Sequence, residues 1–330
     1  MPAVEAKTMN CSVLLSLHYV PTVWEAIDAF GSIGSILMGV TGITTLAVLA
    51  LFVKESMYLL QHWPFQYCFL TLLCLNAFPF AAGGFFVSMI FPRLAEVSKS
   101  LILLYLHASL LMYFRLVIAY GDGDKNMLRK LYGREMVLQG PPLCCLCFCC
   151  PKVPLTRRKF YFVKLAIYQF AVMPLLLTVM KCIGIEYGFI TQGYNLSPYN
   201  AALYISTISS VSIMFGVYGL MVFSRTAAAP MKDFKIIHKF TVLQASFILI
   251  RIQLIIFDVV GQAGAFPCFY PISSAITGHY ISSAVIITEV FILALIAHVV
   301  FLHPPPYMIH LVVPLANSNS PGSQIVDLTS

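Results

Sequence analysis

Two charged residues, Arg251 and Glu289, lie deep inside long apolar stretches of the sequence. Arg251 is about eleven residues from one end of its stretch, or roughly 17 Å along a helix, and Glu289 lies at a similar depth in a core ~30 Å thick. An unpaired charge there costs about 2.5–3.5 kcal/mol, which pairing between neighbouring helices would offset. Two interpretations follow: a static ion pair that fixes helix packing, or an Arg251 that attracts an anionic substrate while Glu289 positions it.

A dense run of cysteines is the most specific local pattern. Five of the ten cysteines fall between Cys144 and Cys150, and the basic segment Arg157-Arg158-Lys159 follows. A zinc site typically uses two separated ligand pairs, and the cytosol disfavours disulfides. Thiols beside a basic cluster and a membrane-entering helix favour S-palmitoylation over inert or metal-binding thiols. The predicted palmitoylation sites are Cys144, Cys145, Cys147, Cys149 and Cys150.

The second apolar stretch is interrupted by Asn76, Pro79 and the pair Gly83-Gly84. Broken helices expose backbone polar groups that bind solutes in transporters, so Asn76 is a candidate substrate-binding residue. The simpler alternative is an ordinary proline kink.

Signatures of enzymes are absent from the sequence. His107, His279 and His298 fall in or near apolar stretches, but one histidine per helix is not a metal-binding signature. No GxxxxGK[ST] phosphate-binding loop occurs, which argues against ATP-driven pumping. We expect neither an enzyme nor a cofactor.

Membrane helices must position these residues, because the chain is too apolar for a soluble fold. Only 10% of its residues are charged, against roughly 25% in soluble domains, and its mean hydropathy is +0.86. Stretches near the ~20 residues that span a bilayer recur at roughly 31–53, 64–90, 98–119, 160–182, 199–223, 237–260 and 279–302. The predicted fold is an all-α polytopic membrane protein with about seven transmembrane helices.

The distribution of basic residues predicts the orientation. Of the twenty Lys and Arg residues, fourteen flank one side of the spans and four flank the other. The positive-inside rule then places the N-terminus outside and the C-terminus in the cytosol, and the net charge of +7 indicates a cytosolic membrane face, not nucleic acid. Two glycosylation sequons, at Asn10 and Asn195, fall on the predicted outside.

These boundaries divide the chain into three parts. We expect an extracellular N-terminal segment (1–30), a seven-span domain (31–302) with a cytosolic cysteine-rich loop (120–159), and a cytosolic tail (303–330).

Several motifs together resemble the alpha subunits of organic solute transporters. They are the cysteine run with Leu155-Thr156-Arg157-Arg158-Lys159, then Phe91-Pro92-Arg93, Lys239-Phe240 with Gln244, Gly261-Gln262 before Cys268, and Glu289-Val290-Phe291. The resemblance implies facilitated transport of sterol-like organic anions, such as bile acids and steroid conjugates, across the plasma membrane. It also implies a single-span beta subunit. We therefore add Gln244 to the candidate substrate-binding residues and expect membrane lipids and an organic anion as ligands.

Three points stay open at this stage. The chain is alternatively a trafficking or scaffold protein of the wider family, or a seven-helix receptor, although it lacks the receptors' Asp/Glu-Arg-Tyr and Asn-Pro-x-x-Tyr motifs. It is also open whether the heterodimer with a beta subunit itself dimerises, and whether the protein is located in endomembranes as well as in the plasma membrane. Cys182 and Cys268 both fall on the predicted outside, and the sequence does not decide whether they are joined.

Overall fold

A computed structural model describes residues 20–136, 138, 153–188, 201–269 and 271–302. Seven of its helical segments are long and apolar enough to cross a membrane. This confirms the predicted all-α fold class and the number of spans. The most apolar part of each segment is at most half buried within the protein, and in the first segment only 17% of it is buried. The remaining apolar surface is left for lipid to cover.

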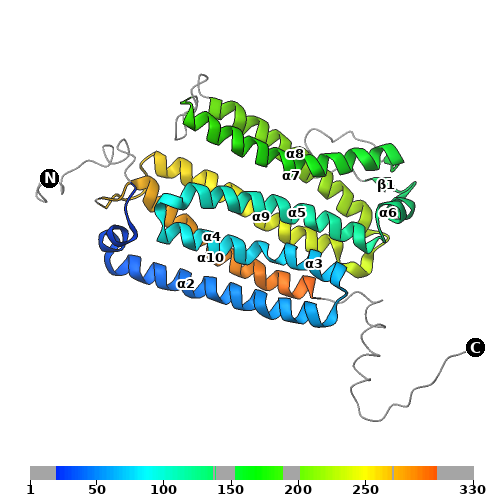
Figure 1. The fold of residues 1–330 in the computed structure, drawn as a ribbon, viewed down its shortest axis with the longest axis horizontal. Helices are drawn as coiled ribbons and strands as arrows, with labels where there is room; N and C mark the ends of the chain where they lie inside the picture. The colour runs from blue at the N-terminus through cyan, green and yellow to red at the C-terminus, as the bar shows by residue number, and fades with distance from the viewer. Residues whose placement is uncertain (1–19, 137, 139–152, 189–200, 270, 303–330) are drawn as a thin grey trace, which may run out of the picture.

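The elements follow one another in a simple order. They are α2 (Val23–His62), α3 (Phe65–Leu75), α4 (Ala77–Ile90), η2 (Pro92–Leu94), α5 (Ala95–Tyr120), α6 (Asp124–Leu131), β1 (Glu135–Met136), β2 (Val153–Pro154), α7 (Arg157–Glu186), α8 (Ala201–Ala228), η3 (Lys232–Phe234), α9 (Ile236–Gln262) and α10 (Ser274–Phe301). Strands β1 and β2 pair antiparallel beside α6, at one end of the bundle (Figure 1).

Helix α2 is longer than predicted and turns sharply near its start. Thr22 and Glu25 form a capping box that begins the helix at Val23. Gly31 has φ +59°, a conformation that residues with a Cβ atom rarely adopt. A short first segment therefore stands at an angle to the long remainder (Figure 1).

The second membrane segment is broken at Asn76, between α3 and α4. Pro79 has no amide hydrogen to donate to Leu75, four residues earlier, so the regular helical pattern cannot continue through this turn. The predicted interruption of this span is present in the structure.

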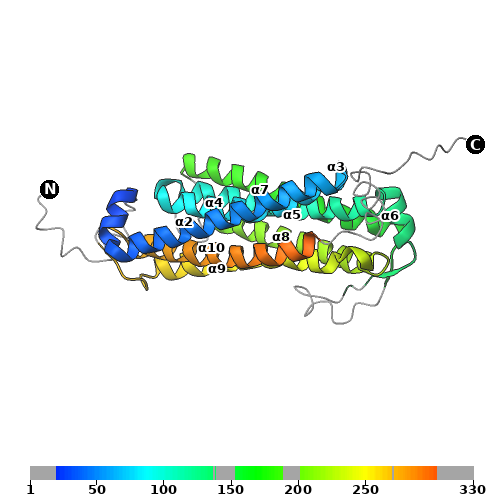
Figure 2. The same cartoon turned by 90° about the horizontal axis from the view of Figure 1, so that it is seen from below.

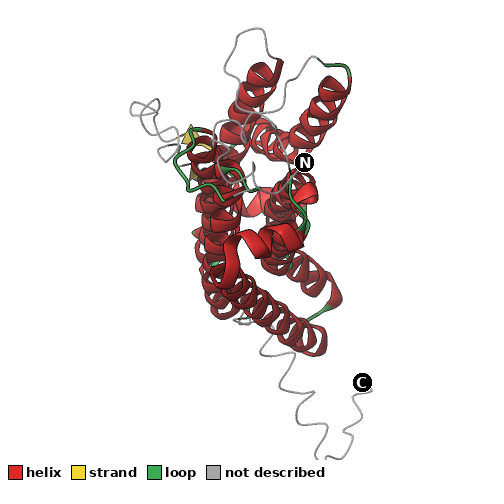
Figure 3. Ribbon diagram, turned by 90° about the vertical axis from the view of Figure 1, so that its left-hand side faces the viewer, coloured by secondary structure: helices red, strands yellow, loops and turns green. Residues whose placement is uncertain are grey.

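The membrane helices form two layers of three, with α2 across one edge. In one layer α4 packs on α5 and α5 on α7; in the other α10 packs on α9 and α9 on α8. The layers meet through the pairs α4–α10, α5–α9 and α7–α8, while α2 contacts α4 and α10 (Figure 2). Seen end-on, α7 and α8 form the opposite edge (Figure 3). Helices α5 and α9 are consequently the central pair.

Candidate functional site: a polar seam between two central helices

Polar and charged side chains line the contact between α5 and α9, which we call the α5–α9 seam. The two helices run antiparallel, so the start of α5 meets the end of α9. On α9, Gln244, Phe247, Arg251 and Asp258 recur at intervals of three, four and seven residues, which puts them on one helix face. The seam is defined by Lys99, His107, Tyr113 and Tyr120 of α5 and Lys239, Gln244, Arg251 and Asp258 of α9.

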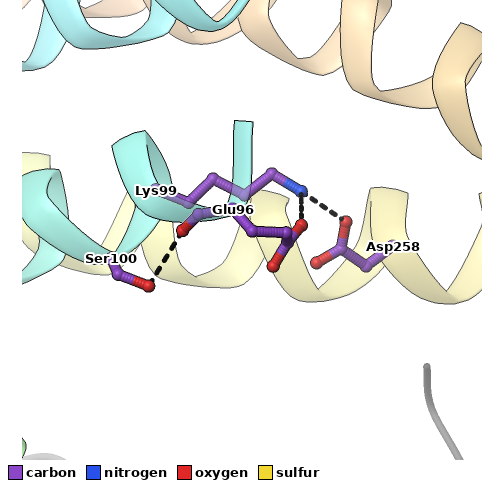
Figure 4. A network of polar contacts seen from close by, with 4 residues as sticks. All are labelled: Glu96, Lys99, Ser100 and Asp258. Carbon is purple, nitrogen blue, oxygen red and sulfur yellow. Dashed lines mark hydrogen bonds and ion pairs between the residues drawn. The ribbon is translucent and has the colours of Figure 1, made fainter. Parts of the chain in front are cut away.

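An ion network occupies the end of the seam where α5 begins. The Lys99 ammonium lies 3.1 Å from the Glu96 carboxylate, one turn away, and 3.1 Å from the Asp258 carboxylate (Figure 4). The Lys99 side chain is 11% exposed, whereas the Asp258 and Glu96 side chains are 36% and 77% exposed. The network therefore joins the two layers and opens toward one membrane surface.

Two further groups lie close enough to affect this network. Lys181 of α7 acts electrostatically on both Glu96 and Asp258, and the imidazole of His279 of α10 acts on Glu96. Side chains of four membrane helices thus meet at one end of the bundle.

The middle of the seam holds polar atoms without hydrogen-bond partners among the described residues. The imidazole of His107 contacts the carbonyl oxygen of Leu103 through Nδ1, but its buried Nε2 has none. The Phe170 and Phe247 rings flank it, with centroids at 4.7 and 4.9 Å. Arg251 acts electrostatically on the same imidazole.

Gln244 lies nearer the other end of α9 and is buried. Neither its amide nitrogen nor its amide oxygen has a hydrogen-bond partner within the part of the chain that the structure covers. Buried polar groups are normally satisfied, so these atoms are available to a ligand or to water.

The opposite end of the seam is closed by tyrosines and a buried lysine. Tyr113 donates toward Ser224 Oγ at 3.2 Å and the Ile236 carbonyl oxygen at 3.0 Å. The Lys239 ammonium donates to Tyr120 Oη at 3.0 Å. The Tyr120, Phe301 and Trp63 rings surround that ammonium, with centroids 4.9, 5.6 and 5.9 Å away.

The predicted substrate-binding residues do not gather at a single point. Arg251 and Gln244 lie on the seam, whereas Asn76 lies at the α3–α4 break and donates to Tyr105 Oη of α5 at 2.7 Å. Glu289 of α10 accepts a hydrogen bond from Gln253 of α9 at 2.6 Å. Gln253 follows Arg251 by two residues and so points to a different side of α9.

Sequence analysis missed several of the most strongly connected side chains. Asp258 lies inside the apolar stretch expected at 237–260, and Glu55 follows the expected end of the first span at residue 53. In the structure Glu55 is buried and lies 3.1 Å from His298 Nδ1. For Asp258, an acid inside an apolar stretch was the available signal.

Other predicted sites fall beyond the described residues. Asn10, Asn195 and the five cysteines Cys144, Cys145, Cys147, Cys149 and Cys150 all do. Cys182 is an exposed free cysteine, whereas Cys268 is disulfide-bonded, so these two are not joined to each other.

No group of three His, Cys, Asp or Glu residues among the described side chains is placed to hold a metal ion. Two apolar crevices lie away from the seam, one lined by Phe30 and Tyr280 and the other by Met136 and Phe160. The seam instead provides cations at both ends and near its middle.

Comparison with known proteins adds an independent line of information. A family model described as "Organic solute transporter Ostalpha" matches residues 37–307. The chain is 26% identical to "Organic solute transporter subunit alpha" of Danio rerio over 281 residues, which cover 85% of this chain and 86% of that protein. The proteins of the same name from Bos taurus and Homo sapiens are each 26% identical, over 86% and 85% of this chain and 83% of their own lengths. No solved structure matches significantly.

Proposed function

Because the chain belongs to the organic solute transporter Ostalpha family, we propose that it carries sterol-like organic anions, such as bile acids and steroid conjugates, across the membrane. Membership in this family and seven apolar helices make it a multi-pass subunit of a membrane transporter. Substrate class, partner and direction of flux belong to the proposal.

The α5–α9 seam is the observation that carries the proposal. An organic anion that leaves water must keep its charge paired, because an isolated charge in an apolar medium is very costly. Lys99, Arg251 and Lys239 are spaced along the central helices between the two ends of the bundle. A steroid body would meanwhile lie against apolar side chains, as ligands do in mainly apolar binding sites.

Flux is proposed to follow the gradient of the substrate in either direction. The sequence contains no GxxxxGK[ST] loop, and no energy-coupling motif is evident elsewhere in it. Membership in a family of transporter subunits leads us to expect no enzymatic activity.

A second subunit completes the proposed transporter. The relatives are named as alpha subunits, which implies a partner in those proteins. For this chain we propose a single-span beta subunit, with dimerisation of the resulting heterodimer. The plasma membrane is the proposed site of action.

The proposed orientation has the N-terminus outside and the cysteine-rich loop in the cytosol. The disulfide at Cys268, which follows α9, fits an oxidising exterior at that end. The exposed Lys125, Arg129 and Lys130 of α6 lie at the opposite end, as the positive-inside rule requires of a cytosolic face. Glycosylation at Asn10 and Asn195 and palmitoylation of the cysteine run belong to the same proposal.

A flux measurement tests the proposal. The full chain is expressed with and without a candidate beta subunit, and uptake and efflux of labelled estrone sulfate and taurocholate are measured in sodium-containing and sodium-free medium. Bidirectional, sodium-independent flux that needs both chains is the expected result. Surface expression with a cognate partner but without flux would favour the scaffold interpretation instead.

A further inference from the structure

Lys239 is an unusual buried cation. It is 1% exposed, and no carboxylate of the described residues forms an ion pair with it. Within the described part of the chain, its ammonium makes one hydrogen bond, to Tyr120 Oη at 3.0 Å. An ammonium can donate three hydrogen bonds, so this one retains unused capacity.

Among the described residues, aromatic rings take the place of a counter-ion. The Tyr120, Phe301 and Trp63 rings lie around the ammonium, and their π faces attract a cation. They carry no net charge, however, and burying an ammonium without an anion is unfavourable. An anion that reached this position would therefore gain a strong, desolvated partner.

Four helix ends meet at this cage. Lys239 lies in the first turn of α9, Tyr120 is the last residue of α5, and Phe301 is the last residue of α10. Trp63 is the residue that caps the end of α2. Separation of any of these ends would expose the ammonium at the end of the α5–α9 seam.

The other end of the seam is different. There Lys99 already has two carboxylate partners, Glu96 and Asp258, so an arriving anion must compete with them. At Lys239 an arriving anion would displace only neutral rings. The two lysines are thus unequal, and Lys239 is the one in need of an anion.

We propose that Lys239 is an anion-binding residue at the α6 end of the seam, which pairs with the anionic group of the substrate once the Trp63, Tyr120 and Phe301 rings separate. This inference rests on the proposed function and assigns one residue to it. The aromatic cage holds the cation while no anion is bound, and it closes that end of the seam.

Replacement of the ammonium by an apolar group tests the role. Lys239→Met keeps the unbranched shape of the side chain, shortens it by one atom and removes the charge, and Lys232→Met removes an exposed charge at the same end of the bundle. We expect Lys239→Met to reach the surface with its partner and to raise the half-saturating concentration of estrone sulfate at least about tenfold. Lys232→Met should change it less than about twofold.

The outcomes separate this inference from the proposed function. Absence of flux in the unaltered protein would overturn the proposed function. Normal flux in the unaltered protein together with unchanged half-saturation in Lys239→Met would overturn only the role of Lys239.

A measurement on the unaltered protein removes any dependence on how the variant folds. The complex is exposed to an amine-reactive ester, and modification of Lys239 and Lys232 is followed by mass spectrometry. We expect estrone sulfate to slow modification of Lys239 at least about threefold while leaving Lys232 unchanged, because a bound anion shields the ammonium. Equal rates at Lys239 with and without estrone sulfate would contradict the proposal.

Discussion

The ammonium of Lys99 and the carboxylate of Asp258 lie 3.1 Å apart, although 159 positions separate these residues in the sequence. Their contact joins the central helix of one layer to the central helix of the other. Glu96 shares the same ammonium, so the network holds two acids and one base. Removal of the base should therefore be more harmful than removal of one acid.

This asymmetry gives the first prediction. Asp258→Asn should lower the stability of the detergent-solubilised protein by about 1–2 kcal/mol, and Lys99→Met by about 2–4 kcal/mol, because the latter removes the ammonium that bridges the two carboxylates. Thermal unfolding of the two variants shows which of them loses more stability. The exposed Lys130–Asp122 pair, at 3.0 Å, is the matched control, and Lys130→Met should cost under ~1 kcal/mol. Equal effects of Lys99→Met and Lys130→Met would contradict the network.

The close approach of α7 and α8 gives a second prediction. A Cβ atom at Gly216 would collide with the side chain of Phe170 on α7, whereas Gly83 has open space around it. Gly216→Ala should destabilise the protein by about 1–3 kcal/mol through overpacking. Gly83→Ala should be neutral or stabilising, since alanine favours helix. The same thermal assay compares the pair, and a harmless Gly216→Ala would refute the tight α7–α8 contact.

A third prediction concerns the break between α3 and α4. The hydrogen bond from Asn76 to Tyr105 Oη, at 2.7 Å, ties the break to α5. Asn76→Ala and Tyr105→Phe should each cost about 1 kcal/mol, and the double variant should cost less than their sum. Strict additivity in this double-mutant cycle would mean that the two side chains do not interact.

The cysteine run gives a fourth prediction, independent of the packing of the helices. Changing Cys144, Cys145, Cys147, Cys149 and Cys150 to Ser should abolish the acyl-biotin exchange signal, because these thiols lie beside a basic segment that anionic lipid attracts. Changing Cys182, an exposed free thiol on a different segment, should leave the signal intact. An undiminished signal from the five-serine variant would exclude acylation there.

Hydropathy was sufficient to predict the number of spans, since lipid selects long apolar helices whatever their neighbours are. Hydropathy did not predict where α2 begins and ends. The first span was expected at 31–53, but the helix covers Val23–His62. Just past Lys54 the helix carries Glu55, which is buried and lies 3.1 Å from His298 Nδ1 of α10. That contact is made by another part of the chain, so the local sequence does not reveal it.

The candidate site was predictable only in part for the same reason. Arg251 and Glu289 were correctly recognised as polar groups in an apolar setting, and depth alone suggested that they pair. The structure gives Glu289 a hydrogen bond from Gln253, and the pairing of Arg251 with Glu289 stays a prediction. Depth can be counted from the sequence, whereas the rotation of each helix about its axis depends on how all the helices pack.

Flux through variants of the central arginine tests the account most directly. With the partner subunit present, Arg251→Gln should reduce estrone sulfate uptake and efflux at least about tenfold at normal surface expression, because the mid-membrane cation that pairs with the anion is lost. Arg115→Gln is the control, since Arg115 is exposed on α5 and lies over the Tyr168 ring, 5.9 Å from its centroid. We predict a loss of flux in Arg251→Gln alone; equal flux in both variants and the unaltered protein would contradict an anion path along the α5–α9 seam.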